Sequence, residues 1–212
     1  PGVVPADSHH SVAIDRHHRQ ELVRRSRAGV VEDLGRGPGD GGGIACVAGI
    51  GAIDVPARLQ RDGLQHGQAV AILGMSNINY ALVYLAAVRA GGCAAPLTTS
   101  ATPAQLSAML RDSGAMHLFV DAAKLAELGG IDLGDVRIVI LDNGDAPHPS
   151  LDAWMAEEGA TFAAAEPAPT DPFNIIYSSG TTGTPKGIIH SHAMRWHQMA
   201  GGFKSIYSRD TR

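Results

Sequence analysis

The hydrophobic positions after residue 55 fall into short apolar runs separated by segments with helical spacing. Runs of strand length occupy residues 69–73 (AVAIL), 116–120 (MHLFV), 136–141 (VRIVIL) and 173–177 (FNIIY), and a short strand is expected around Ala94. Short apolar runs bounded by turn residues are typical of strands, and we expect FNIIY to be buried. The alternation of strands with helical segments predicts an α/β fold with a largely parallel sheet flanked by helices.

Two of the intervening helices carry clear start and stop signals. Ser76 is expected to cap a helix running through residues 80–88, with Gly91 in position to end it. Thr102 is expected to cap the next helix, with Pro103 at its first position, where the missing N–H is tolerated. The side chains expected to line one face of that helix are Leu106, Met109 and Leu110. Shorter helices are predicted at residues 124–128 and 151–158, with a loop at 145–150 and a linker at 163–172.

The segment before residue 55 lacks this pattern. Arginine and histidine are concentrated in its first part, and glycine is dense between Gly35 and Gly43. Dense glycine costs backbone entropy, and few apolar side chains are present to offset that cost by burial. We therefore divide the chain into an atypical, poorly ordered segment, 1–54, and a folded domain, 55–212.

Composition narrows the class of protein. The chain has 212 residues, 44% hydrophobic and 18% charged, with a formal net charge of −4. This composition favours a globular protein, and the mild acidic balance argues against a nucleic-acid partner. Cys46 and Cys93 have no metal or disulfide spacing, and the longest apolar stretch, 41–53, is shorter than the ~20 residues of a membrane span. We expect a cytoplasmic protein without a transmembrane segment, and the oligomeric state stays open.

A polar, glycine-rich segment directly follows FNIIY and carries the candidate chemistry. Its glycines let backbone N–H groups approach phosphate oxygens, its hydroxyls add donors of which one could reach a magnesium ion, and its lysine adds a mobile cation. The proline stiffens the turn. The residues of this candidate phosphate-binding loop are Ser178, Ser179, Gly180, Thr181, Thr182, Gly183, Thr184, Pro185, Lys186 and Gly187.

The residue types of the loop allow two other interpretations. The common P-loop requires a glycine-lysine pair followed by Ser or Thr, whereas Lys186 lies between Pro185 and Gly187, so that class is excluded. A polar hairpin loop between Ile176 and Ile188 with no ligand stays open on residue types alone, because Gly, Ser and Thr clusters mark many loops.

The full string YSSGTTGTPKG resembles the signature loop of the adenylate-forming superfamily, which contains acyl- and aryl-CoA ligases, nonribosomal adenylation domains and firefly-type luciferases. Upstream segments resemble the superfamily's N-terminal subdomain in the same order, at residues 64–73, 77–80, 88–97 and 101–106. The resemblance covers roughly residues 55–204 and implies a truncated N-terminal subdomain of the adenylate-forming fold.

This resemblance also implies an activity. Members of the superfamily activate a carboxylic acid with ATP and Mg²⁺ as an acyl-adenylate, and commonly pass the acyl group to coenzyme A. The loop from Ser178 to Gly187 would hold the β- and γ-phosphates of ATP. We expect a fragment of an acyl- or aryl-CoA ligase, with a piece of an amino-acid adenylation domain and a non-catalytic remnant as alternatives. The residue types do not identify the carboxylic acid.

In the superfamily, the adenine-binding, ribose-binding and metal-binding segments and the catalytic lysine lie well downstream of this loop. Only residues 188–212 follow the loop here, so no catalytic residue is assigned and no metal site is certain. We therefore expect residues 1–212 alone not to catalyse adenylation.

Other polar residues receive simpler interpretations. His190 and His192 alternate, as two ligands on one strand would, but they are better explained as a strand end leading into a helix at 193–204. Asp112, Asp121 and Asp142 are interpreted as solvated caps. Two histidine pairs, His9–His10 and His17–His18, are assigned no role. The apolar residues of the last helix are interpreted as core packing, with an acyl pocket as the alternative: Met194, Trp196, Met199 and Phe203.

Overall fold

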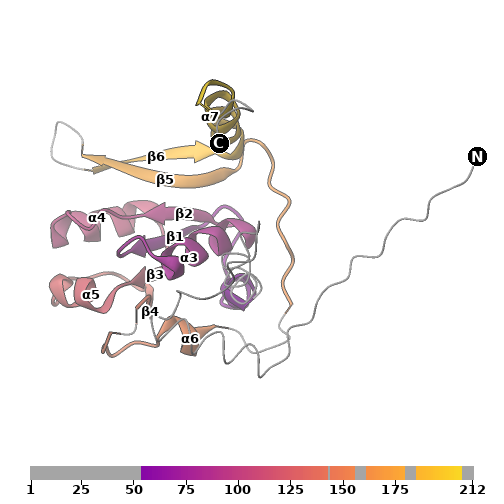
Figure 1. Ribbon diagram of the computed structural model, residues 1–212. Helices are drawn as coiled ribbons and strands as arrows, with labels where there is room; N and C mark the ends of the chain where they lie inside the picture. The colour runs from indigo at the N-terminus through magenta and orange to yellow at the C-terminus, as the bar shows by residue number, and fades with distance from the viewer. Residues whose placement is uncertain (1–53, 143, 156–160, 180–184, 207–212) are drawn as a thin grey trace, which may run out of the picture. The chain divides into compact units, whose positions relative to one another are not determined.

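A computed structural model describes residues 54–142, 144–155, 161–179 and 185–206 of the protein. In these residues the strands form one sheet of order β4-β3-β1-β2-β5-β6 (Figure 1). The pairs from β4 through β5 are parallel, and β6 is antiparallel to β5. The strands are β1 (Ala69–Leu73), β2 (Cys93–Pro96), β3 (His117–Val120), β4 (Arg137–Ile140), β5 (Pro172–Ser179) and β6 (Pro185–Ser191).

Helices connect the parallel strands, as the alternating pattern predicts. A helical segment at residues 54–61 precedes β1. The labelled helices are α3 (Ile78–Arg89), α4 (Pro103–Ser113), α5 (Ala122–Leu128), α6 (Leu151–Trp154) and α7 (His192–Ile206). Parallel neighbours require such crossovers, because a tight turn can join only antiparallel strands. The predicted poorly ordered segment lies outside the described residues, except for its last residue, Asp54, which is helical.

Successive side chains of the central strand β1 belong to two separate cores. Ala69, Ala71 and Leu73 pack with buried residues of α4 and α5 on one face of the sheet. Val70 and Ile72 pack with residues 54–61, α3 and α6 on the other face. Because side chains alternate across a strand, a strand buried on both faces needs a continuous apolar run, and AVAIL supplies it. The predicted α/β fold with flanking helices is confirmed.

The two predicted helix caps have different outcomes. Thr102 caps α4 as predicted, with a reciprocal pair in which the N–H of Gln105 donates to Thr102 Oγ1 at 3.3 Å and the N–H of Thr102 donates to Gln105 Oε1 at 2.9 Å. The cap of α3 is Asn77 and not Ser76, since Asn77 Oδ1 accepts from the N–H of Tyr80 at 2.9 Å. Both residue types cap helices well, so the choice between these neighbours depends on the path of the chain.

Strand β5 is less buried than the run FNIIY predicts. Asn174 and Ile175 are buried, but the side chain of Ile176 is 37% exposed. The reason is the place of β5 in the sheet. It pairs with β2 only between Ala94 and Asn174, and its other neighbour is the edge strand β6. Ile176 and its partner in the register, Ile188, are both exposed at this edge of the sheet.

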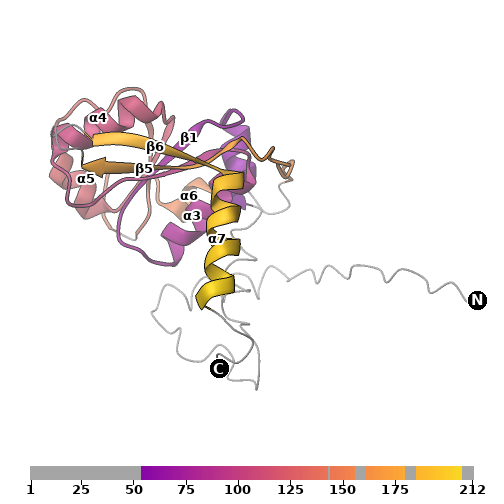
Figure 2. The same cartoon turned by 90° about the horizontal axis from the view of Figure 1, so that it is seen from above.

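Core packing by the last helix is also a wrong prediction. Met194, Trp196 and Met199 are 45%, 71% and 59% exposed, and the side chain of Phe203 lies outside the described residues. The helix α7 follows the edge strand β6 and extends away from the open end of the hairpin, opposite the loop (Figure 2). Apolar residues at helical spacing indicate an apolar face, but they do not say whether anything covers it.

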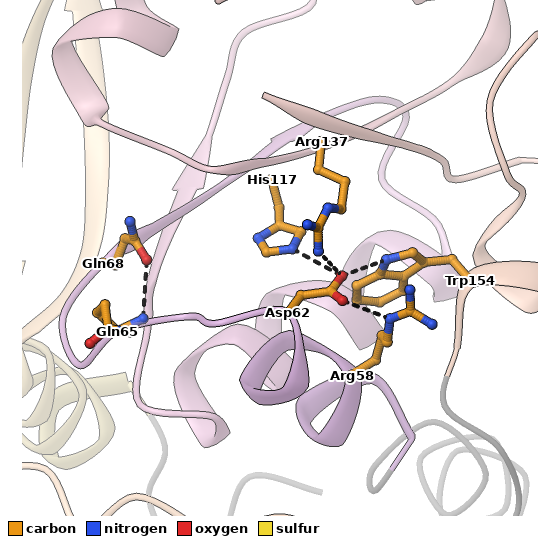
Figure 3. A network of polar contacts seen from close by, with 7 residues as sticks. All are labelled: Arg58, Asp62, Gln65, Gln68, His117, Arg137 and Trp154. Carbon is orange, nitrogen blue, oxygen red and sulfur yellow. Dashed lines mark hydrogen bonds and ion pairs between the residues drawn. The ribbon is translucent and has the colours of Figure 1, made fainter. Parts of the chain in front are cut away.

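The carboxylate of Asp62, directly after the first helical segment, contacts side chains from several elements (Figure 3). Asp62 Oδ1 accepts from Arg58 Nε at 2.9 Å, and Asp62 Oδ2 accepts from Arg137 at 2.6 Å and from Trp154 Nε1 at 3.1 Å. The ring of His117 lies 3.4 Å from the same oxygen. Arg58 belongs to the adjoining helical segment, and the other partners come from β4, α6 and β3, so one side chain links its own segment to three that are distant in sequence.

Candidate functional site

The candidate phosphate-binding loop connects β5 to β6. Ser178 pairs with Lys186 and Ser179 with Pro185 in the antiparallel register, so the two strands are paired up to both ends of residues 180–184. Residues 180–184 lie outside the described residues, and phosphate contact stays a prediction for the whole loop. The described rungs place the backbone of the predicted site residues Ser178, Ser179, Pro185, Lys186 and Gly187 together at one end of the hairpin.

Two of these residues present polar groups to solvent. The side chains of Ser178 and Lys186 are exposed and lie on facing positions of the two strands. Among the ion pairs of the described residues, none engages the Lys186 ammonium. An exposed hydroxyl beside an exposed cation is a suitable pair of donors for a phosphate oxygen.

Tyr177, the last residue before the loop, is tied to helix α4. Its hydroxyl lies 2.8 Å from Asp112 Oδ2 and 3.0 Å from the backbone oxygen of Met109, which are two acceptors for its single proton. Burial, and then the hydrogen bond to Asp112, raises the pKa of the Tyr177 phenol far above its ordinary value. The phenol therefore stays a donor over the physiological pH range.

Gly187 is the partner of Tyr177 in the register and lies close to Asp112, Ile175 and the Tyr177 ring. A Cβ atom at this position would stand 3.1 Å from Asp112 Oδ2, 3.1 Å from Ile175 Cγ2 and 3.2 Å from Tyr177 Cε1. Its expected role is to let the backbone approach phosphate. The structure adds a packing reason for glycine, because a side chain here would crowd the contact between α4 and the hairpin.

The three aspartates interpreted as solvated caps have different outcomes. Asp112 is exposed but accepts from Tyr177. Asp121 is 6% exposed; its Oδ2 accepts from the N–H of Met75 at 2.7 Å, and burial raises the pKa of its carboxyl. Asp142 does act as a cap, because its Oδ1 accepts at 3.1 Å from the N–H of Ala122, the first residue of α5. Burial at the carboxyl ends of central strands explains why Asp121 is not solvated.

The predicted strand end leading into a helix is confirmed at His190 and His192. His190 lies in β6 and His192 begins α7, so the two residues belong to different elements. In the described ranges no three His, Cys, Asp or Glu side chains gather as a metal site would require. The pairs His9–His10 and His17–His18 lie outside those ranges. Within the described helices, none combines the length and apolar character that a bilayer span requires.

Sequence reasoning missed the partners of Tyr177 and Asp62. Asp112 precedes Tyr177 by 65 residues, and Asp62 precedes Trp154 by 92 residues. No spacing rule connects residues so far apart. The only local signal was the position of Tyr177 at the end of an apolar run, since a tyrosine hydroxyl near a core usually requires a hydrogen-bond partner.

The sequence matches the family described as AMP-binding enzyme over residues 54–211. This chain belongs to the AMP-binding enzyme family. The matched region starts with the helical segment at residues 54–61 and includes every described strand as well as the hairpin that carries the loop. The resemblance stated from the loop and its upstream segments is therefore confirmed.

Similar proteins support the same assignment. The chain is 32% identical over 137 residues to a 3-hydroxybenzoate–CoA ligase of Aromatoleum sp. (strain CIB), covering 63% of this chain and 26% of that protein. It is 31% identical over 141 residues to a plipastatin synthase of Bacillus subtilis (strain 168), covering 66% of this chain and 5% of that protein. The crystal structure of the anthranilate CoA ligase AuaEII in complex with anthranoyl-AMP matches with a TM-score of 0.59 and 29% identity, over 65% of this chain and 27% of that one. The chain thus spans about a quarter of the length of such a ligase.

Proposed function

We propose that the protein carrying this chain activates a carboxylic acid with ATP and then transfers the acyl group to coenzyme A. The observation that carries the proposal is the string Ser178–Gly187 at the end of the β5–β6 hairpin, inside a domain of the AMP-binding enzyme family. The similarity to aryl-CoA ligases supports an aromatic acid as substrate, and the nearly equal identity to the plipastatin synthase subunit keeps an amino acid as the alternative.

The chemistry consists of two displacements. A carboxylate oxygen attacks the α-phosphorus of ATP, and the bond from that phosphorus to the bridging oxygen breaks, so that pyrophosphate leaves with the electron pair. The sulfur of coenzyme A, after losing its proton, then attacks the acyl carbon, and AMP leaves with its oxygen. In such phosphoryl chemistry a protein contributes mainly position and charge stabilisation.

The residues of this chain serve the first displacement. The exposed ammonium of Lys186 and hydroxyl of Ser178 would hold oxygens of the leaving pyrophosphate and stabilise the negative charge that develops there. Mg²⁺ fits as the companion of ATP, because phosphate oxygens supply much of its coordination and a loop hydroxyl can add one ligand. These roles assign no general acid or base to the described residues.

The test is replacement of Lys186 by alanine in a protein that carries this sequence at the length of its relatives. Loss of one charge-assisted hydrogen bond costs about 1.5–3 kcal/mol, so adenylation should fall by about 10- to 100-fold with little change in Tm. Rates are measured by pyrophosphate–ATP exchange with benzoate-type acids, fatty acids and amino acids.

Lys124→Ala is the matched control, because Lys124 lies on α5 and pairs with Glu127, away from the hairpin. It should leave the exchange rate unchanged. Equal rates for Lys186→Ala and the parent would show that Lys186 is a surface residue without a phosphate contact. Exchange that depends only on amino acids would favour the adenylation-domain alternative, and absence of exchange with every acid would favour the remnant.

A further inference from the structure

Helix α4 contacts the hairpin at the rung next to the candidate phosphate ligands. Tyr177 and Gly187 face each other in the register, and Ser178 and Lys186 form the following rung toward the loop. The hydroxyl of Tyr177 reaches Asp112 Oδ2 at 2.8 Å. The Ser178–Lys186 rung therefore lies one residue away from the side-chain contact between the hairpin and α4. That contact restricts where the rung can lie.

At this contact the backbone of Gly187 lies close to the side chains of Asp112 and Tyr177. Gly187 has no Cβ, and the atoms that a Cβ would meet include Asp112 Oδ2 at 3.1 Å and the Tyr177 ring at 3.2 Å. The phenol also has a second acceptor, the backbone oxygen of Met109 at 3.0 Å. A hairpin on the edge of a sheet has few other constraints: β5 joins β2 at a single pair, and Ile176, Ile188 and Ile189 are exposed.

We propose that Tyr177 and Asp112 are positioning residues that hold the Ser178–Lys186 rung in place for the phosphates of ATP. The inference rests on the proposed function, since it gives the contact a role only if the rung binds phosphate. An edge hairpin that is free to twist would place the Lys186 ammonium in many positions. ATP binding would then have to order the hairpin, and that entropic cost would reduce the affinity for ATP. The hydroxyl contact with α4 removes that freedom before ATP binds.

The experiment compares the affinity for MgATP, and for inorganic pyrophosphate, among variants of a protein that carries this sequence at the length of its relatives. Tyr177→Phe keeps the ring and removes both hydrogen bonds, so we expect about a 3- to 10-fold weaker affinity with Tm nearly unchanged. Asp112→Ala leaves Met109 O as an acceptor and should weaken binding less. Asp112→Asn keeps an acceptor oxygen and should restore an affinity close to that of the parent.

The double variant and the controls make the outcome decisive. Tyr177→Phe combined with Asp112→Ala should bind no more weakly than Tyr177→Phe alone, because the two changes remove one shared contact. Tyr80→Phe, on α3 at the other face of the sheet, should match the parent. Parent affinity in Tyr177→Phe, with weakened binding in Lys186→Ala, would overturn this inference and leave the proposed function standing. Parent affinity in both variants, or a parent that binds neither ligand, would overturn both.

Discussion

Replacement of Phe119 by alanine is expected to lower the free energy of unfolding by about 3–5 kcal/mol, the range found for deletion of a large buried aromatic side chain. Phe119 lies on the central strand β3 and is fully buried. Its ring meets the ring of Trp154 edge to face, with centroids 5.1 Å apart, and stacks on His117 at 6.4 Å. Removing it leaves a cavity among α3, α6 and the sheet that rigid neighbours fill only in part.

Urea unfolding followed by tryptophan fluorescence measures this change, since Trp154 contacts the deleted ring. Phe162→Ala is the matched control, because Phe162 is only partly buried and its ring contact is to the guanidinium of Arg89 at 5.0 Å. The control variant should lower the free energy of unfolding by less than about 1.5 kcal/mol. A loss for Phe119→Ala no greater than for Phe162→Ala would contradict the assignment of Phe119 to the core.

Replacement of Asp62 by alanine is expected to lower the free energy of unfolding by about 2–4 kcal/mol at neutral pH. The variant leaves Trp154 Nε1 and the ring of His117 without their acceptor, and both lie in a buried region. Breaking a fully buried ionic cluster costs about 3–5 kcal/mol, but Arg58 and Arg137 are 33% and 49% exposed and regain water. Glu127→Ala is the control, since its exposed pair with Lys124 should contribute under about 1 kcal/mol.

The pKa of Asp62 determines how the stability difference between the parent and Asp62→Ala changes with pH. Burial alone would raise the pKa of the Asp62 carboxyl, but the hydrogen bonds and charges of Arg137 and Arg58 outweigh it, so the pKa lies below its usual 3.8. The stabilisation by this charge is complete above pH 3.8 and is lost as the pH falls through the lowered pKa. The difference in stability between the parent and Asp62→Ala should therefore shrink in acid. A difference that stays constant from neutral pH into acid would contradict the ionic role of Asp62.

The sequence predicted most of the strands because their signals are local. The run AVAIL is apolar at every position, and β1 has the predicted bounds, residues 69–73, because both of its faces are covered. The cap of α4 was found for the same reason, since Thr102, Pro103 and Gln105 lie together in the chain. The loop was found through its resemblance to a known family, and its residue types alone left a plain hairpin open.

What the sequence could not supply depends on contacts between distant residues. The burial of Asp121 results from its place at the end of a central strand, and a single aspartate in the sequence does not show it. The exposure of Trp196 and Ile189 results from the edge position of β6 and α7, although both residues favour burial by type. The tie between Tyr177 and Asp112 requires α4 to cross the hairpin, which no local pattern encodes.

The central claim is that the hairpin of β5 and β6 binds the phosphates of ATP through the rung that contains Lys186. Hydrogen–deuterium exchange of a protein that carries this sequence at the length of its relatives, with and without MgATP, tests it most directly. We expect MgATP to slow exchange in peptides that cover residues 172–191, to leave peptides from α5 unchanged, and to lose this effect in Lys186→Ala. No slowing in the hairpin at saturating MgATP, or equal slowing in the parent and in Lys186→Ala, would contradict the claim.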